Sequence, residues 1–294
     1  MSAAKRDLYQ ETTNEIIRLI EAGNLKFESG WAAFLPYNAT TGKRYNGANI
    51  LVLLGRGNAA EYETPAWLTY KQAQACGGNV KRGEKGTTIV YFEMRVIKDE
   101  ESGEEKKLPI LKHSTVFNIA QCENLNPAKL AVSEHPATVA EITEIEHTAA
   151  NFGVEIVHCH AVRSPHYIPS ADKIKMPMRE QFQNAENYYA TLLHEMVHAT
   201  GHESRLARDF SGRFGSEAYA FEELIAELGA AFLCADFGLI GATVENHAAY
   251  LESWLKVLKS DKKAVFTASS QAAKAARLIR EIATGAEERE AKQA

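Results

Sequence analysis

The segment His194–His198 (HEMVH) restricts the fold and the chemistry of this chain more than any other part of it. Residues four apart on an α-helix lie on the same face, so the two histidines can hold one metal ion. Glu195 lies beside them, where it can take a proton from a water at the metal and pass it to a leaving amine. Leu192 and Leu193 help to make the other face of this helix apolar, which places the helix in a core. Because unpaired polar groups are costly to bury, such a helix needs polar partners nearby.

The helix predicted over 216–237 carries acidic residues that suit this role. Its segment Phe221–Gly229 (FEELIAELG) resembles the ExxxD-type signature of gluzincin metallopeptidases, in which a Glu ligand precedes an acidic partner by four residues. On that resemblance Glu223 is the third ligand and Glu227 orients a histidine. Glu stands at 227 where the family usually has Asp or Asn, so Glu227 is also an alternative ligand. Glu222 is a weaker alternative because it points to a different face. The expected ion is Zn²⁺, with another divalent metal such as Mn²⁺ as the alternative.

The periodicity of the remaining sequence predicts an α+β chain of two domains, at 1–130 and 138–294. Residues 126–136 lose periodicity and carry two prolines, which is typical of a linker. The first domain is expected to be a small α+β unit with helices over 8–20 and 67–75 and a β-hairpin with strands over 87–97 and 109–119. The second is expected to be mostly helical with a small sheet, from these elements: a helix from 138 to about 153, a strand over 154–158, an edge strand within 165–177, and helices over 184–199, 216–237, 244–259 and 268–283.

Composition argues against a membrane protein and against a disulfide-stabilised one. No run approaches the roughly 18 apolar residues of a membrane span, and the N-terminus lacks the apolar segment of a signal peptide. The four cysteines form no CxxC pair, which is typical of a reducing compartment, so we expect a cytoplasmic protein. The net charge of −5 hides an asymmetry: residues 1–130 contain 17 Lys+Arg and 15 Asp+Glu, giving +2 there and −7 in the remainder. Any binding of nucleic acid is therefore expected in the first half.

Four segments, in order, resemble the ArdC-type antirestriction proteins of conjugative plasmids. They are WAAFLPYNATTGKRYNGANILVL, TPAWLTYKQAQACGGNVKRGEKGTTIVYF, HEMVHATGHESRL and FEELIAELGAAFL. The similarity covers nearly the whole chain, so it is more specific than the HExxH motif alone. It implies an N-terminal domain that binds single-stranded DNA and a C-terminal zincin-like metallopeptidase domain. It also implies that incoming plasmid DNA is protected from host restriction during conjugation.

The first half interleaves aromatic residues with amide and basic groups, as sequence-tolerant single-strand binders do. The resemblance implies that eight of these residues lie on the DNA face: Trp31, Tyr45, Asn46, Trp67, Lys71, Gln72, Arg82 and Lys85. A small charge of +2 favours a local basic and aromatic strip over a broad positive field.

Two other hypotheses fit the same sequence. The chain is alternatively a non-catalytic single-strand binder whose metal site is structural or regulatory, although such a site has no need of Glu195. A less favoured alternative is a plain peptidase whose first domain binds peptide. For a peptidase, the expected protein partner is a host restriction component or another protein substrate. Tyr167, Tyr188 and Tyr189 are candidate donors to a tetrahedral oxyanion.

Overall fold

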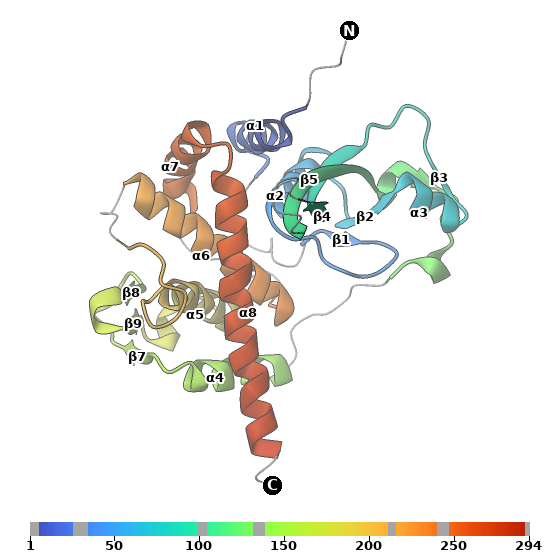
Figure 1. Cartoon of the computed structure of the whole chain (residues 1–294). Coiled ribbons are helices and arrows are strands. Elements are labelled where there is room, and N and C mark those ends of the chain that lie inside the picture. The colour runs from blue at the N-terminus through green and yellow to red at the C-terminus, as the bar shows by residue number, and fades with distance from the viewer. Residues whose placement is uncertain are drawn as a thin grey trace. The chain divides into compact units, whose positions relative to one another are not determined.

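A computed structural model describes residues 6–25, 35–98, 105–131, 139–210, 216–239 and 247–291. The chain divides into two compact units, Met1–Leu25 with Pro36–Ser133 and Lys26–Leu35 with Glu134–Ala294. Each unit contains helices and a sheet, so the predicted α+β class is confirmed (Figure 1). In the part of the chain that the structure describes, no helix combines the length and apolarity needed to cross a bilayer.

The first unit is built around a four-stranded sheet with the strand order β1-β2-β5-β4. Its elements are α1 (Leu8–Glu21), β1 (Tyr37–Asn38), α2 (Ala48–Ala59), β2 (Ala66–Thr69), α3 (Tyr70–Ala75), β3 (Asn79–Val80), β4 (Thr87–Lys98), β5 (Glu105–Asn118) and β6 (Cys122–Glu123). Strands β4 and β5 form the predicted hairpin, an antiparallel ribbon paired from Thr87↔Val116 to Lys98↔Glu105. Strands β3 and β6 form a separate two-stranded sheet.

The helix predicted over 67–75 is wrong in its first part, which is strand β2. Trp67 and Leu68 are buried and pair with Asn118 and Phe117 of β5, and this sheet pairing overrides local helical propensity. The helix begins only after Thr69, whose side chain accepts a hydrogen bond from the backbone N–H of Gln72 while the Gln72 side chain bonds back to Thr69, a capping box.

The second unit combines a three-stranded sheet with a helical layer. Its elements are α4 (Val139–Asn151), β7 (Glu155–His158), β8 (His166–Ile168), β9 (Lys173–Met176), α5 (Ala185–Thr200), α6 (Glu217–Asp236), α7 (His247–Ser260) and α8 (Ala264–Ala291). Helix α6 packs against α5, α7 and α8, so the HExxH helix and the acidic helix are direct neighbours (Figure 1).

The segment predicted as one edge strand within 165–177 is instead two strands, β8 and β9. The strand order is β7-β9-β8, so β9 is the central strand and β8 lies at the edge. Asp172, in a left-handed conformation (φ 46°), reverses the chain between them. Burial of Ile174 and Met176 explains the central position of β9.

Candidate metal centre

Helices α5 and α6 position the candidate site because they approach each other closely. Asn184 is the N-cap residue of α5, and its side chain accepts a hydrogen bond from the N–H of Asn187 at 2.8 Å. Ser216 caps α6 in the same way by accepting from the N–H of Tyr219. At the crossing, a Cβ added to Gly229 would lie 2.8 Å from Cγ1 of Val197. Glycine at this position therefore lets α6 come against the turn of α5 that carries the histidines.

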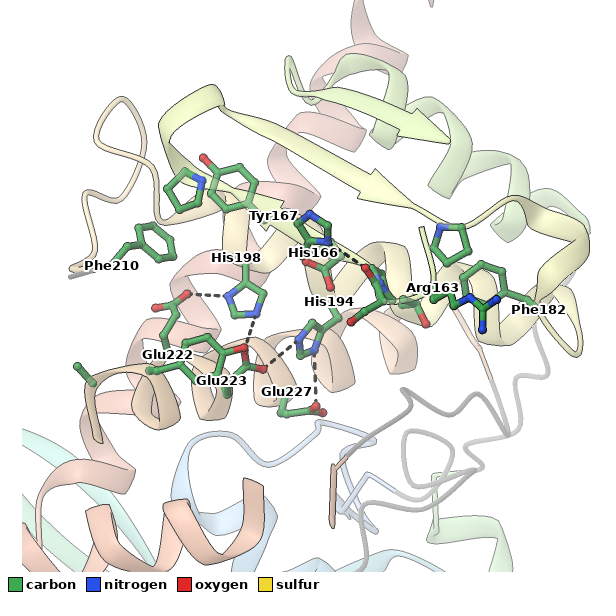
Figure 2. Close-up of a pocket in the computed structure, with 18 of the residues that line it drawn as sticks. Arg163, His166, Tyr167, Phe182, His194, His198, Phe210, Glu222, Glu223 and Glu227 are labelled. Carbon is green, nitrogen blue, oxygen red and sulfur yellow. Dashed lines mark hydrogen bonds and ion pairs between the residues drawn. The ribbon is translucent and has the colours of Figure 1, made fainter. Parts of the chain in front are cut away.

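His194, His198 and Glu223 converge on one point between the two helices (Figure 2). Nε2 of His194 lies 3.5 Å from Oε2 of Glu223, and Nε2 of His198 lies 3.6 Å from Oε1 of the same carboxylate. One ligand atom from each residue lies within 4.8 Å of the others, and all three residues are buried.

The second ring nitrogen of each histidine faces a carboxylate of its own. Nδ1 of His194 lies 3.6 Å from Oε1 of Glu227, and Nδ1 of His198 lies 3.2 Å from Oε1 of Glu222. Such contacts fix the ring orientation and leave Nε2 directed at the shared point. Glu222, which was expected on a different face of α6 from Glu223, therefore contacts the Nδ1 side of the His198 ring, whereas Glu223 lies on its Nε2 side.

Arg208 holds Glu222 in place, and sequence reasoning missed it. Its guanidinium donates to both carboxylate oxygens of Glu222, from Nη2 to Oε1 at 2.7 Å and from Nε to Oε2 at 2.9 Å. It also donates to the carbonyl of Val197 at 2.7 Å and to the hydroxyl of Thr200 at 2.7 Å, at the C-terminal end of α5. No motif signals this role, because Arg208 lies in the irregular segment after α5 and meets Glu222 only through the fold.

The electrostatics of the site attract positive charge. Burial alone lowers the pKa of His198, but hydrogen bonds with Glu222 and Glu223 raise it well above its ordinary value. Burial likewise opposes protonation of His194, yet the charge of Glu227 raises the pKa of this histidine overall. Conversely, burial raises the pKa of Glu223, but hydrogen bonds with both histidines hold it below the ordinary value.

Glu195 differs from the other acidic groups of the site because one of its carboxylate oxygens is buried and accepts no hydrogen bond from any described residue. It is 4% exposed, and its Oε2 is buried without a hydrogen-bond partner in the part of the chain that the structure describes. Burial raises the pKa of Glu195, and the charges of His194 and His198 only partly oppose this effect. Burying a carboxylate oxygen without a hydrogen-bond partner is costly, so its presence here indicates that Glu195 interacts with a group bound at the site.

The residues present fit a divalent metal ion. Ligand atoms about 2.0–2.2 Å from a tetrahedral ion lie roughly 3.3–3.6 Å from one another, which matches the separations between Glu223 and the two histidines. Two imidazoles and one carboxylate, with carboxylates behind the imidazoles, are the donor set of a zinc hydrolase. His194, His198 and Glu223 would hold the ion.

A cavity of about 760 Å³ opens over this site. Strand β8 contributes His166 and Tyr167 to its wall, Arg163 and Phe182 lie toward one end, and Phe210 lies toward the other (Figure 2). The cavity is therefore large enough for a peptide segment in addition to water.

The candidate oxyanion donors have other partners. Among the three tyrosines, only Tyr167 lines the cavity, and its hydroxyl donates to Asp172 at 2.7 Å. The hydroxyl of Tyr188 contacts His158, and that of Tyr189 donates to Glu146. Tyr219, one turn before Glu223 on α6, lines the cavity and was missed, although the i, i+4 spacing could have indicated it.

Replacing Gly229 by alanine tests the close approach of the helices. The new methyl group would overlap Val197, a short and stiff side chain that cannot move aside. Overpacking of this kind costs about 1–3 kcal/mol, against about 1 kcal/mol gained from helix propensity, so we expect a net loss of about 1 kcal/mol in the free energy of unfolding. Urea denaturation measures it, and the double variant Gly229→Ala/Val197→Ala should lack this clash. If Gly229→Ala lowered the free energy of unfolding equally in the wild type and in the Val197→Ala variant, overlap with Val197 would not be the cause.

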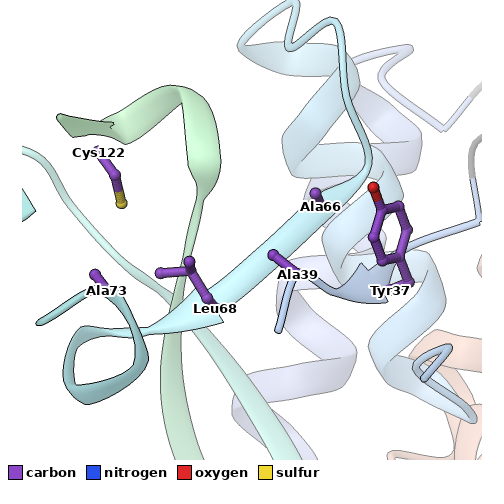
Figure 3. Packing of buried hydrophobic residues seen from close by; sticks show 6 residues of the cluster. All are labelled: Tyr37, Ala39, Ala66, Leu68, Ala73 and Cys122. Carbon is purple, nitrogen blue, oxygen red and sulfur yellow. The ribbon is translucent and has the colours of Figure 1, made fainter. Parts of the chain in front are cut away.

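The first unit places the residues of the expected DNA face in different environments. Trp31 lies outside the described residues. Trp67 is only 1% exposed and packs with Leu53 and Val116, so the expectation that its ring lies on a DNA face is corrected. Its neighbour Leu68 belongs to a different core cluster, shown in Figure 3, because successive strand residues point to opposite faces.

Gln72 is also a structural residue in this unit. Its side-chain amide bonds to Thr69, Asn38 and Thr40, which links the start of α3 to the turn after β1. These bonds occupy the amide that was expected to face DNA. Tyr45 is half-buried, and burial raises the pKa of its hydroxyl.

Four members of the expected DNA face have exposed side chains: Asn46, Lys71, Arg82 and Lys85. The two last lie in the turn between β3 and β4. Their exposure permits contact with phosphate groups.

Comparison with known proteins assigns a family to each half. Residues 6–117 match the N-terminal domain of the anti-restriction factor ArdC, and residues 143–271 match the zincin-like metallopeptidase family. The chain is 38% identical to a DNA primase TraC of Escherichia coli over 93% of its own length, but it spans only 27% of that protein. It is also 38% identical to the y4eC protein of Sinorhizobium fredii, covering 90% of this chain and 89% of that one.

Solved structures agree with these matches over both units. The metal-free crystal structure of the antirestriction ArdC protein from plasmid R388 is 41% identical, with a TM-score of 0.78, covering 95% of this chain and 99% of that one. Its Mn(II)-bound structure gives 38% identity and a TM-score of 0.75, covering 95% and 98%. The chain therefore belongs to the ArdC family of antirestriction proteins, with an ArdC-type N-terminal domain followed by a zincin-like metallopeptidase domain.

Proposed function

We propose that this protein binds single-stranded DNA through its first unit and carries a metal-dependent peptidase site in its second, and that it protects incoming conjugative plasmid DNA from host restriction. The observation that carries the catalytic half is Glu195, a buried carboxylate beside His194, His198 and Glu223, one oxygen of which has no hydrogen-bond partner among the described residues. A purely structural ion needs its ligands and their supports but has no use for such a group. Protection acts on DNA that has entered the cell, so the proposed location is the cytoplasm, which agrees with four free cysteines.

In this proposal the chain's own residues move the protons. A bound divalent ion supplies Lewis-acid polarisation of the scissile carbonyl and of the attacking water. Glu195 accepts the proton of that water and returns it to the leaving amine. Glu222 and Glu227 hold the imidazoles in orientation, and Arg208 fixes Glu222. The ion proposed is Zn²⁺, with Mn²⁺ as the alternative that the R388 relative supports.

Replacing Glu195 by glutamine should strongly reduce peptidase activity without loss of the fold or the metal. Removing a proton acceptor of this kind costs about 10²–10⁴-fold in rate. The glutamine also removes a buried unpaired charge, so we expect the melting temperature to stay level or rise. Metal content, thermal melting and peptide cleavage measure the three effects, with exposed Glu203→Gln as the matched control. Loss of metal in the Glu195 variant would disprove the assigned role.

The same variant separates the two candidate accounts of antirestriction. Plasmid transfer into a restricting recipient should fall with Glu195→Gln if proteolysis contributes to protection. Full protection by this variant would favour a non-catalytic single-strand binder whose metal site is structural or regulatory. If protection is lost, the next step is to identify the protein substrate, such as a host restriction component.

Single-strand binding should depend on salt in proportion to the cations that contact phosphates. If Lys71, Arg82 and Lys85 each neutralise one phosphate, the slope of log K against log salt is about −2. Lys85→Ala should reduce the magnitude of this slope by about 0.7, whereas Lys256→Ala in the second unit should leave it unchanged. Fluorescence anisotropy with a labelled oligonucleotide measures both. If alanine at none of these three positions changed the slope, the DNA would contact a different surface of the protein.

A further inference from the structure

The β4–β5 ribbon of the first unit has an open outer edge. Strand β4 is the last strand of the sheet and, among the strands that the structure describes, pairs with β5 alone. At one point the outer edge is occupied: the Asn49 side chain donates to the carbonyl of Val90 at 2.7 Å and accepts from its N–H at 2.8 Å. The backbone groups of Val90 therefore face away from β5.

Because backbone orientation alternates along a strand, every second residue of β4 directs its N–H and C=O groups to the same edge as Val90. Phe92, Met94 and Val96 follow Val90 at intervals of two, so their N–H and C=O groups face the same outer edge. Within the described ranges, no backbone or side-chain group hydrogen-bonds to these three residues on that edge. An unpaired edge of this kind is a template for another strand.

The side chains along this edge are apolar and uncovered. Phe92, Met94 and Val96 share one face of the ribbon and are 52%, 57% and 53% exposed. Opposite them on β5, Pro109 is exposed and Leu111 is half-buried. A contiguous apolar row beside free backbone groups is a feature of protein–protein contact sites.

We propose that β4 pairs edge to edge with β4 of a second copy of this chain, antiparallel about a two-fold axis at Met94. In this register Met94 faces the partner's Met94, and Phe92 faces the partner's Val96. The pairs occupy the positions whose backbone groups point outward, as the hydrogen bonds of Asn49 to Val90 establish. The contact closes on itself and leaves neither β4 edge open.

Charge complementarity supports a second copy as the occupant. The register places Glu93 opposite the partner's Arg95, twice by symmetry. Glu93 already lies 3.3 Å from Lys112 of β5, and the new pair gives its carboxylate a second cation. Arg95 is exposed and has no ion pair or hydrogen bond with any described residue.

Sedimentation velocity of the full chain over a concentration series tests this dimer. The wild type is expected to associate reversibly towards twice the monomer mass. Met94→Lys places two like charges on the symmetry axis and should weaken association at least about tenfold. Surface control Lys256→Glu should leave it unchanged. A wild type that stays monomeric at every concentration, or that associates only when an oligonucleotide is added, would overturn the proposal.

Charge exchange tests the register itself. Arg95→Glu places Glu93 opposite a glutamate, and Glu93→Arg places Arg95 opposite an arginine, so each single variant should lose association. The double variant Glu93→Arg/Arg95→Glu should recover it, and an equimolar mixture of the two single variants should form mixed dimers. Circular dichroism checks that each variant is folded. Failure of the folded double variant and of the mixture to recover would also overturn the proposal.

Discussion

Replacing Arg208 by alanine is expected to destabilise the second unit by about 3–5 kcal/mol, because it leaves Glu222 buried without its cation. Both side chains are nearly inaccessible, at 5% and 8% exposure. The change also removes donors to the carbonyl of Val197 and to Thr200 at the end of α5. Urea denaturation followed by circular dichroism measures the loss.

A matched control is provided by Arg179, which pairs with Glu146 at 2.7 Å but is 54% exposed. Arg179→Ala should cost less than about 1 kcal/mol, as exposed ion pairs do. Adding Glu222→Gln to Arg208→Ala should recover part of the stability, since the uncompensated charge is then removed. Equal losses for Arg208→Ala and Arg179→Ala would contradict a buried pair.

Exchanging Glu223 for glutamine is expected to lower metal affinity by more than about 100-fold, because the position loses its anionic donor. Glu227→Gln should lower it only by about 10–100-fold, the range for groups that orient a ligand. The two substituted residues lie about one helical turn apart on the same buried face of α6, and both variants make the same chemical change. Isothermal titration with Zn²⁺ and with Mn²⁺ measures both. The reverse ranking would make Glu227 the ligand and Glu223 its support.

Metal-site spacing could be predicted because it is local. His194 and His198 share one face of a helix, as their spacing predicts, whereas the roles of Glu223 and Glu227 on the next helix were predicted from the resemblance to the gluzincin signature. Arg208 could not be found in this way, because its position follows from a chain reversal after α5. The strand character of Trp67 was likewise hidden, since it depends on pairing with Asn118, far along the sequence. Local patterns thus indicate the ligands, whereas burial and long-range pairing require the fold.

The metal site between α5 and α6 has a consequence for the order in which the second unit folds. The polar groups around the shared point all come from two helices: His194, Glu195 and His198 from α5, and Glu222, Glu223 and Glu227 from α6. The contact between His198 and Glu222 spans only 24 positions. Contacts of such short sequence separation close early, with a small entropic penalty. The ion would therefore bind a helical hairpin before the rest of the unit has condensed around it. Metal would then speed folding as well as slow unfolding, because the ion would bind before the tertiary structure of the second unit is complete.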